Sequence, residues 1–186
     1  MNKLAFTAII LFSTAVCAAE PPPYFPDNAT TPGLANRKVT QGNINKTICN
    51  ARWLKAQQPS AGYLDKEKNR QLARVTFANT DPKAFEEDHR IPIELGGHPR
   101  DAKNLWPQST TIEWNAAAKN KLETYVHGEV CAKRMKLADA RAIFQRDWTD
   151  VFRSYCGPGP TAACQPPNTP GVQIEDPKRP NVPIVK

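Results

Sequence analysis

Apolar residues recur at helical spacing in two long parts of the chain. Within residues 111–126, four of them fall near one face of a helix: Ile112, Ala116, Leu122 and Val126. Within residues 137–155 they recur at steps of three or four, at Ala140, Phe144, Trp148, Val151 and Tyr155. This spacing predicts two helices, each with one buried face. A shorter helix is expected over residues 65–73, where helix-forming residues predominate.

The stretch between the first two of these helices along the chain has a different pattern. Residues 89–95 mix apolar and polar side chains in a short extended run, which Gly96 and Gly97 interrupt. Residues 103–107 form a second short run that ends at a proline. We therefore expect the order strand, long loop, strand, helix in this part of the chain, and an α+β fold.

Composition divides the chain into a folded part and two tails. Residues 33–156 have the composition of a globular domain and contain all four tryptophans. Residues 20–32 and 157–186 are rich in proline and show little apolar periodicity, which predicts extended, mobile tails.

The first 19 residues are typical of a secretory signal peptide. Lys3 supplies the positive start, residues 4–12 form an apolar run, and small residues follow at 17–19. The apolar stretch is interrupted by hydroxyl side chains and is shorter than the roughly 20 residues of a spanning helix, so we expect no stable membrane insertion. A secreted or periplasmic location is predicted.

The four cysteines beyond this segment form an even set, which favours disulfides in an oxidising compartment. Three pairings are possible. We favour Cys156 with Cys164, which are close in sequence across a Gly-Pro turn, and Cys49 with Cys131, which would join the start of the domain to its end. A zinc site is the alternative, but the spacing contains no Cys-x-x-Cys pair.

The charge of the chain favours an anionic partner. Lys and Arg number 25 and Asp and Glu 18, which gives a formal net charge of +7 and a pI of about 9.3. A basic balance of this size is common among proteins that bind nucleic acid.

Several polar residues of the strand-loop-strand-helix unit suit phosphodiester hydrolysis. Asp88 and His89 open the unit, Asn104 lies on the second strand, and Asn115 lies in the first turns of the helix, one turn before Lys119. This reaction needs a base for water, a divalent cation and positive groups for the phosphate backbone. A neutral imidazole can be the base, and carboxylate and amide oxygens suit a hard cation such as Mg²⁺.

The same residues resemble a known family. EEDHRIPIELGG at residues 86–97, NLWP at residues 104–107, Asn115 and Lys119 are similar to the HNH, or ββα-metal, endonucleases, in the variant with Asn at the third signature position. The likeness is closest to small exported bacterial proteins with the pattern DHxIPxELGG…NLWPQ. In these proteins an Ile-Cys pair precedes the motif and a Val-Cys pair follows it, as at Cys49 and Cys131 here. The resemblance covers roughly residues 33–153.

The resemblance implies a small ββα-metal core with additional helices, and a role for each matching residue. His89 is then the general base, Asp88 and Asn115 hold one divalent metal ion, and Asn104 braces the loop and orients His89. Mg²⁺ is the expected ion, with Mn²⁺ and Zn²⁺ as alternatives. Phosphate contacts are expected from cationic side chains of the unit: Lys119 and Lys121, with Arg90 and Arg100 as weaker candidates. Two departures concern Asn115: the segment after Asn104 is longer than in many members, and Asn replaces His.

The leading hypothesis is a metal-dependent endonuclease with weak sequence specificity that cleaves DNA, while RNA stays open as a substrate. The alternatives are a non-catalytic nucleic-acid-binding protein and a disulfide-bonded interaction protein of the cell envelope. Each residue also has a structural alternative. His89 can be a hydrogen-bonded structural histidine, Asp88 a turn cap, and Asn115 an exposed helix residue; His127 is expected to act as a favourable charge at a helix end.

Overall fold

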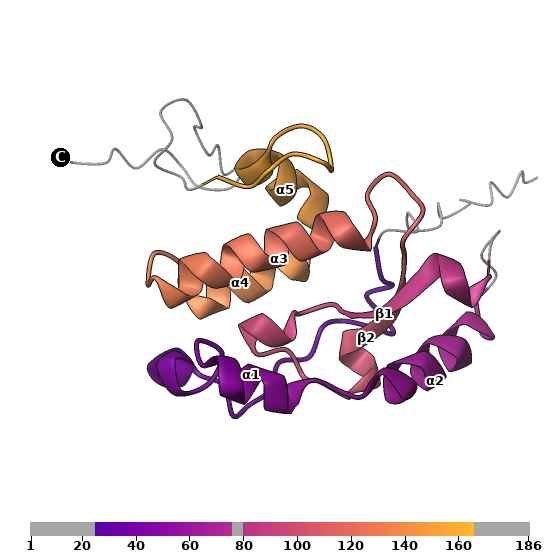
Figure 1. Cartoon of the computed structure of the whole chain (residues 1–186), viewed down its shortest axis with the longest axis horizontal. Helices are drawn as coiled ribbons and strands as arrows, with labels where there is room; N and C mark the ends of the chain where they lie inside the picture. Colours follow the sequence, from indigo (N-terminus) through magenta and orange to yellow (C-terminus); the bar gives the residue numbers. More distant parts are fainter. Residues whose placement is uncertain (1–24, 76–79, 166–186) are drawn as a thin grey trace, which may run out of the picture.

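A two-stranded antiparallel sheet lies between two groups of helices in the computed structural model, which describes residues 25–75 and 80–165 (Figure 1). The strands are β1 (Phe85–His89) and β2 (Leu105–Ser109). The α-helices of the described residues are α1 (Ala51–Gln57), α2 (Ala61–Leu72), α3 (Ala116–Cys131), α4 (Leu137–Phe144) and α5 (Trp148–Cys156). Short 3₁₀ turns are η1 (Gln41–Lys46), η2 (Pro82–Ala84), η3 (Ile93–Leu95) and η4 (Ala102–Asn104).

The predicted order of strand, loop, strand and helix is confirmed, but the strand limits differ. β1 ends at His89 instead of beginning there, and β2 continues through Pro107. Pro107 pairs with Glu87 and is tolerated because each strand of a two-stranded sheet has a free edge. The apolar side chains that suggested a strand after His89 are buried in the loop and in η3: Ile91, Ile93 and Leu95.

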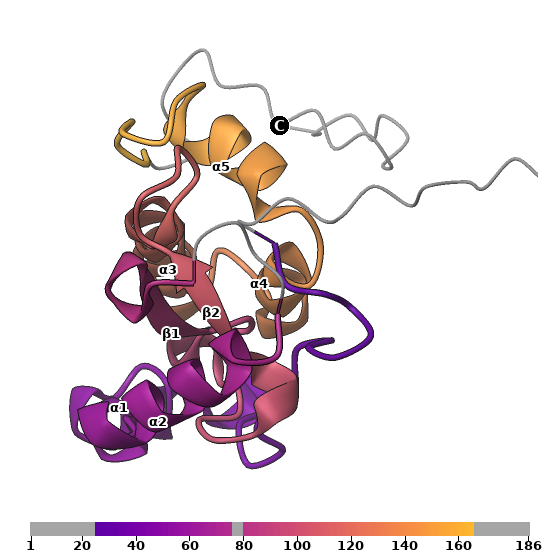
Figure 2. The same cartoon turned by 90° about the vertical axis from the view of Figure 1, so that its right-hand side faces the viewer.

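The helices cover the sheet from two sides. In Figures 1 and 2, α3, α4 and α5 lie on one side and α1 and α2 on the other. α2 packs against both strands, and α3 packs against α4 and α5. The main core lies among α3, α4 and α5, where Trp114 makes edge-to-face contacts with Trp148 and Phe152 at centroid distances of 6.0 and 5.4 Å.

The single helix predicted for residues 137–155 is wrong, because the structure has two helices there. α4 ends at Phe144, and Asp147 caps α5 by accepting a hydrogen bond from the Thr149 amide at 2.9 Å. The guanidinium of Arg90 donates hydrogen bonds to the carbonyl oxygens of Phe144 and Gln145, at 3.3 and 2.6 Å. These carbonyls at the end of α4 are satisfied by a distant side chain, which lets the chain turn before α5.

The remaining helix limits also shift. α2 begins four residues earlier than predicted, after Ser60, whose hydroxyl accepts a hydrogen bond from the Tyr63 amide. α3 begins only at Ala116 and continues to Cys131. α1 and η1 were not predicted.

Both predicted disulfides are confirmed. Cys49, between η1 and α1, is bonded to Cys131 at the last residue of α3, across a sequence separation of 82. Cys156, the last residue of α5, is bonded to Cys164. In the chain-entropy account, closing the larger loop stabilises the fold by about 4 kcal/mol.

Parts of the two predicted tails contact the domain. The Arg90 guanidinium lies 5.4 Å from the centre of the Phe25 ring and donates to the Thr31 carbonyl at 2.5 Å. At the other end, the Gln165 amide donates to the Tyr155 carbonyl at 3.2 Å. The predicted signal peptide and most of the C-terminal tail lie outside the described residues. Within the described ranges, no helix has the length and apolar character needed to cross a membrane.

Candidate active site around His89

His89 is held by the loop that joins the two strands. It is the last residue of β1 and is only 8% exposed, and its Nε2 lies 3.0 Å from the carbonyl oxygen of Pro99. Because a carbonyl only accepts hydrogen bonds, Nε2 carries the proton and Nδ1 keeps the lone pair. Burial lowers the pKa of His89, although the Pro99 carbonyl and Asp88 oppose this effect. The imidazole is therefore neutral at pH 7, as a general base must be.

Asn104 closes the same loop with its side-chain amide. It is fully buried, and its Oδ1 accepts from the amides of Ile91 at 2.9 Å and Leu34 at 3.3 Å. Its Nδ2 donates to the carbonyls of Ile91 and His98, both at 3.0 Å. Asn104 makes no contact with the imidazole itself. It fixes the backbone on both sides of the loop, and so places the Pro99 carbonyl to which His89 is bonded.

The Gly96-Gly97 pair is required by how tightly this loop folds. A Cβ atom on Gly97 would lie 1.8 Å from the Ile91 carbonyl oxygen and 2.8 Å from Nδ2 of Asn104. Gly96 has a φ of +71°, in the left-handed region that glycine adopts without strain. A side chain at position 97 would force the backbone and the Asn104 amide apart.

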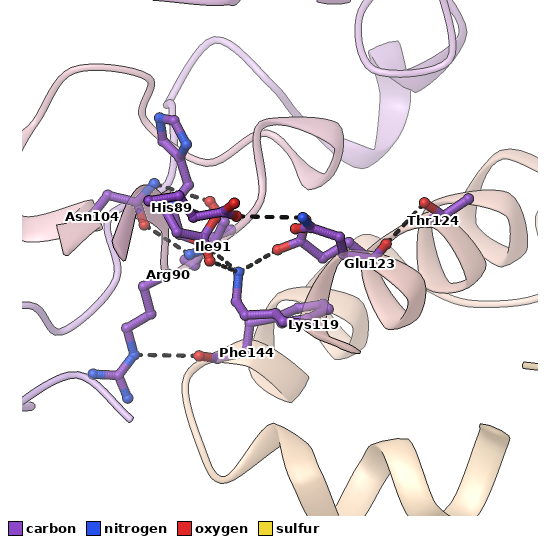
Figure 3. A network of polar contacts seen from close by, with 11 residues as sticks. His89, Arg90, Ile91, Asn104, Lys119, Glu123, Thr124 and Phe144 are labelled. Carbon is purple, nitrogen blue, oxygen red and sulfur yellow. Dashed lines mark hydrogen bonds and ion pairs between the residues drawn. The ribbon is translucent and has the colours of Figure 1, made fainter. Parts of the chain in front are cut away.

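Asp88 is tied to the helix that follows the sheet. Its Oδ1 accepts from the His89 amide at 2.7 Å, and its Oδ2 accepts from the Lys119 ammonium at 2.6 Å. The same ammonium donates to the His89 carbonyl at 2.9 Å and to the Glu123 carboxylate, as Figure 3 shows. Lys119 thus uses all three of its protons: two join α3 to β1, and the third bonds Glu123 within α3.

Electrostatics keep the Lys119 ammonium charged in this buried cluster. Burial alone would lower the pKa of Lys119, but the Asp88 and Glu123 carboxylates outweigh burial, so the pKa is raised and the ammonium stays protonated. Burial raises the pKa of Glu123, and Asp88 acts in the same direction while Lys119 opposes them. The single ammonium of Lys119 therefore forms ion pairs with both Asp88 and Glu123.

A cavity of about 180 Å³ opens beside His89 and Asp88. Its lining brings the imidazole together with four carboxyl groups, those of Glu87, Asp88, Glu94 and Glu123. Burial, with Glu67 and Asp88 adding to it, raises the pKa of Glu87 to about 8, and its Oε2 is buried without a hydrogen-bond partner in the described structure. These side chains line one cavity, but among the described residues no three of their ligand atoms lie within 4.8 Å of one another.

Asn115 is placed differently from the other predicted site residues. It is the N-cap of α3, and its Oδ1 accepts from the Ala118 amide at 3.1 Å. It does not line the cavity with Asp88 and His89. The carboxyl group that α3 contributes there is Glu123, which the sequence reasoning missed. Its signal was its position four residues after Lys119, which places both on one helix face.

Two of the predicted phosphate contacts do not fit the structure. Arg90 and Lys119 are each 1% exposed. The donors of Arg90 are taken by backbone carbonyls, and those of Lys119 by Asp88, Glu123 and the His89 carbonyl. Both cations stabilise the fold from inside, where a phosphate cannot reach them.

The other two predicted cations lie at the surface. Lys121 donates to the carbonyls of Pro160 and Thr161 at 3.3 and 3.1 Å. Arg100 is exposed and directly follows Pro99, with its guanidinium 5.9 Å from the centre of the Tyr63 ring. Of the four predicted cations, Arg100 is therefore the one that stays accessible beside the loop holding His89.

Among the described residues, one group has ligand atoms close enough together to hold a metal ion. One ligand atom from each of Cys49, His127 and Cys131 lies within 4.8 Å of the others. The two sulfur atoms are joined in the disulfide described above, so they are not thiolate ligands in this state.

No model of a known family matches the chain, and no similar curated protein or solved structure was found.

Proposed function

We propose that this protein is a metal-dependent endonuclease that hydrolyses phosphodiester bonds of DNA with weak sequence specificity. The observation that carries the proposal is the position of His89: its Nε2 lies 3.0 Å from the Pro99 carbonyl oxygen, and the residue lines a cavity together with four residues that carry carboxyl groups. The strand-loop-strand-helix unit that supplies these groups supports a ββα-metal core.

The carboxyl groups that line the cavity are oxygen donors of the type that a divalent cation prefers. Asp88 and Glu123 would hold the ion, with Glu94 as a further oxygen donor on the cavity wall. These groups are carboxylates, which suit Mg²⁺ and Mn²⁺ better than soft metals. When bound, the ion neutralises charge on the phosphate and on the leaving oxygen. Asn115 is not needed as a ligand in this arrangement, because its amide caps α3.

The protein's own residues then have distinct tasks. His89 takes a proton from water at Nδ1, since Nε2 is already protonated. Asn104 holds the loop that orients His89 in its conformation. Lys119 holds Asp88 and the His89 carbonyl in place. Arg100 offers a phosphate contact at the edge of the loop, which binds backbone rather than bases.

The deciding experiment is a plasmid-nicking assay with oxidised, purified protein in Mg²⁺, Mn²⁺, Zn²⁺ or chelator, with RNA as a parallel substrate. Nicking that depends on Mg²⁺ or Mn²⁺ and stops with chelator is expected. Binding to DNA without any cleavage would favour the non-catalytic alternative. If the protein is not retained on a polyanion column at moderate salt, the result would favour the alternative of a disulfide-bonded interaction protein of the cell envelope.

A further inference from the structure

The disulfide at the end of α3 has a histidine beside it. His127 lies one turn before Cys131 on α3, and its Nε2 is 3.3 Å from the Cys131 sulfur. Cys49 reaches the same point from the loop before α1, and all three residues are half-buried. None of the three lines the cavity around His89. This cluster is therefore separate from the proposed active site.

His127 was expected to act as a favourable charge at a helix end, but its contacts are with a backbone carbonyl and a sulfur atom. Its Nε2 lies 2.9 Å from the Ile48 carbonyl oxygen, so Nε2 carries a proton in the oxidised protein. The imidazole thus faces the Ile48 carbonyl beside Cys49 and the sulfur of Cys131. A histidine in this position is one of the three ligands that a zinc site needs.

We propose that the reduced protein binds one Zn²⁺ ion through the thiolates of Cys49 and Cys131 and the imidazole of His127. Reduction of the disulfide by an external dithiol or phosphine adds two electrons and two protons and gives two thiols. Zinc binding then displaces both thiol protons to solvent. The disulfide and the zinc ion are alternative crosslinks between the same two segments of the chain.

The chemistry of the three groups selects zinc over the hard cations expected at the other site. Two thiolates and an imidazole suit Zn²⁺, with bond lengths of about 2.3 Å to sulfur and about 2.0 Å to nitrogen. The donor atoms around such an ion lie within 4.8 Å of one another, a limit that the three ligand atoms already satisfy here. Because the residues are half-buried, water can supply the fourth ligand. Binding at Nε2 moves its proton to Nδ1 and replaces the Ile48 hydrogen bond with a metal bond.

Cobalt is a direct probe of this site, because Co²⁺ bound to thiolate gives a charge-transfer absorption that carboxylate ligands do not give. The full-length protein is reduced with a phosphine and titrated with Co²⁺ and then Zn²⁺. We expect one equivalent of Co²⁺ with the thiolate band and its displacement by Zn²⁺. The oxidised protein gives no such band.

Variants assign the ligands. Cys156→Ser with Cys164→Ser removes the other thiol pair and keeps the band, whereas Cys49→Ser with Cys131→Ser abolishes it. His127→Ala weakens Co²⁺ binding by roughly tenfold or more. The same band in the Cys49→Ser and Cys131→Ser variant, or undiminished affinity in His127→Ala, would overturn the proposal.

Thermal unfolding covers the case in which the reduced protein is unstable. Zn²⁺ should raise the Tm of the reduced Cys156→Ser and Cys164→Ser variant, or restore its fold if reduction unfolds it. A reduced chain that Zn²⁺ neither stabilises nor refolds contradicts the proposal. Neither measurement depends on nuclease activity.

Discussion

The Nε2 atom of His89 lies 3.0 Å from the Pro99 carbonyl oxygen, across the loop that joins β1 to β2. This single contact fixes the tautomer of a buried imidazole and leaves Nδ1 with the lone pair that the proposed base needs. The contact exists because Asn104 holds the loop on both sides, at Ile91 and at His98.

The pH dependence of cleavage follows from the environment of His89. Burial lowers the pKa of His89 below its ordinary value of 6.5. The neutral base therefore persists as the pH falls through 6.5, and the acidic limb of kcat/KM should lie below that value. A pH-rate profile with saturating Mg²⁺ measures it. A limb centred well above pH 6.5 would contradict a buried, neutral His89 as the base.

Asn104 should matter for both stability and rate. Asn104→Ala leaves backbone groups of Ile91 and His98 without partners, and should lower the free energy of unfolding by about 2 to 4 kcal/mol. Asn104→Asp keeps the oxygen that accepts from Ile91, but it places a buried carboxylate oxygen against the Ile91 and His98 carbonyls and should lose at least as much stability. Urea unfolding measures the stability, and kcat should fall in both variants with little change in KM. Asn45→Ala, at an exposed asparagine, is the control.

The strand-loop-strand-helix order was predictable because its signals are local. Each signal is a short stretch that lies close in sequence to the next: the mixed run at 89–95, the Gly96-Gly97 break, the run at 103–107 and the helical spacing that follows. The break between α4 and α5 was not predictable in this way, because the apolar period continues through it from Phe144 to Trp148. What ends α4 there includes Arg90, a residue 54 positions away in sequence from Phe144.

The candidate site was predictable in part for the same reason. Asp88 and His89 are neighbours in sequence, so their proximity needed no tertiary information. Sequence patterns do not distinguish a buried, paired cation from a solvated one. The partner of Lys119 on β1 is Asp88, 31 residues away, and only the packing of α3 on the sheet brings them together. The same packing brings Glu123 to the cavity.

Lys119 should be a strong determinant of stability. Lys119→Met leaves Asp88 and Glu123 buried without their shared cation, and should lower the free energy of unfolding by about 3 to 5 kcal/mol. Added Mg²⁺ should recover part of this loss if the two carboxylates can share a divalent ion. Lys121→Met, at an exposed position of the same helix, should change stability by about 0.5 kcal/mol or less. Equal stability of the two variants would refute the role of Lys119.

Arg100 should contribute to binding nucleic acid without a role in the fold. Arg100→Ala should weaken binding of a short DNA duplex and reduce the slope of log affinity against log salt by about one. Fluorescence anisotropy over a series of salt concentrations measures both. Arg146→Ala, at an exposed position between α4 and α5 that does not line the cavity, is the control. If the slope of log affinity against log salt is unchanged in Arg100→Ala, Arg100 does not contact the nucleic acid.

The most direct test of the account compares plasmid nicking by the native protein and by His89→Asn in Mg²⁺. Asparagine cannot take a proton from water, and its shorter side chain loses the Nε2 hydrogen bond to the Pro99 carbonyl, so the Tm is measured alongside to show that the variant is folded. We predict a nicking rate at least about a hundredfold lower in His89→Asn, with DNA binding unchanged. Equal nicking rates in the two proteins would contradict the account.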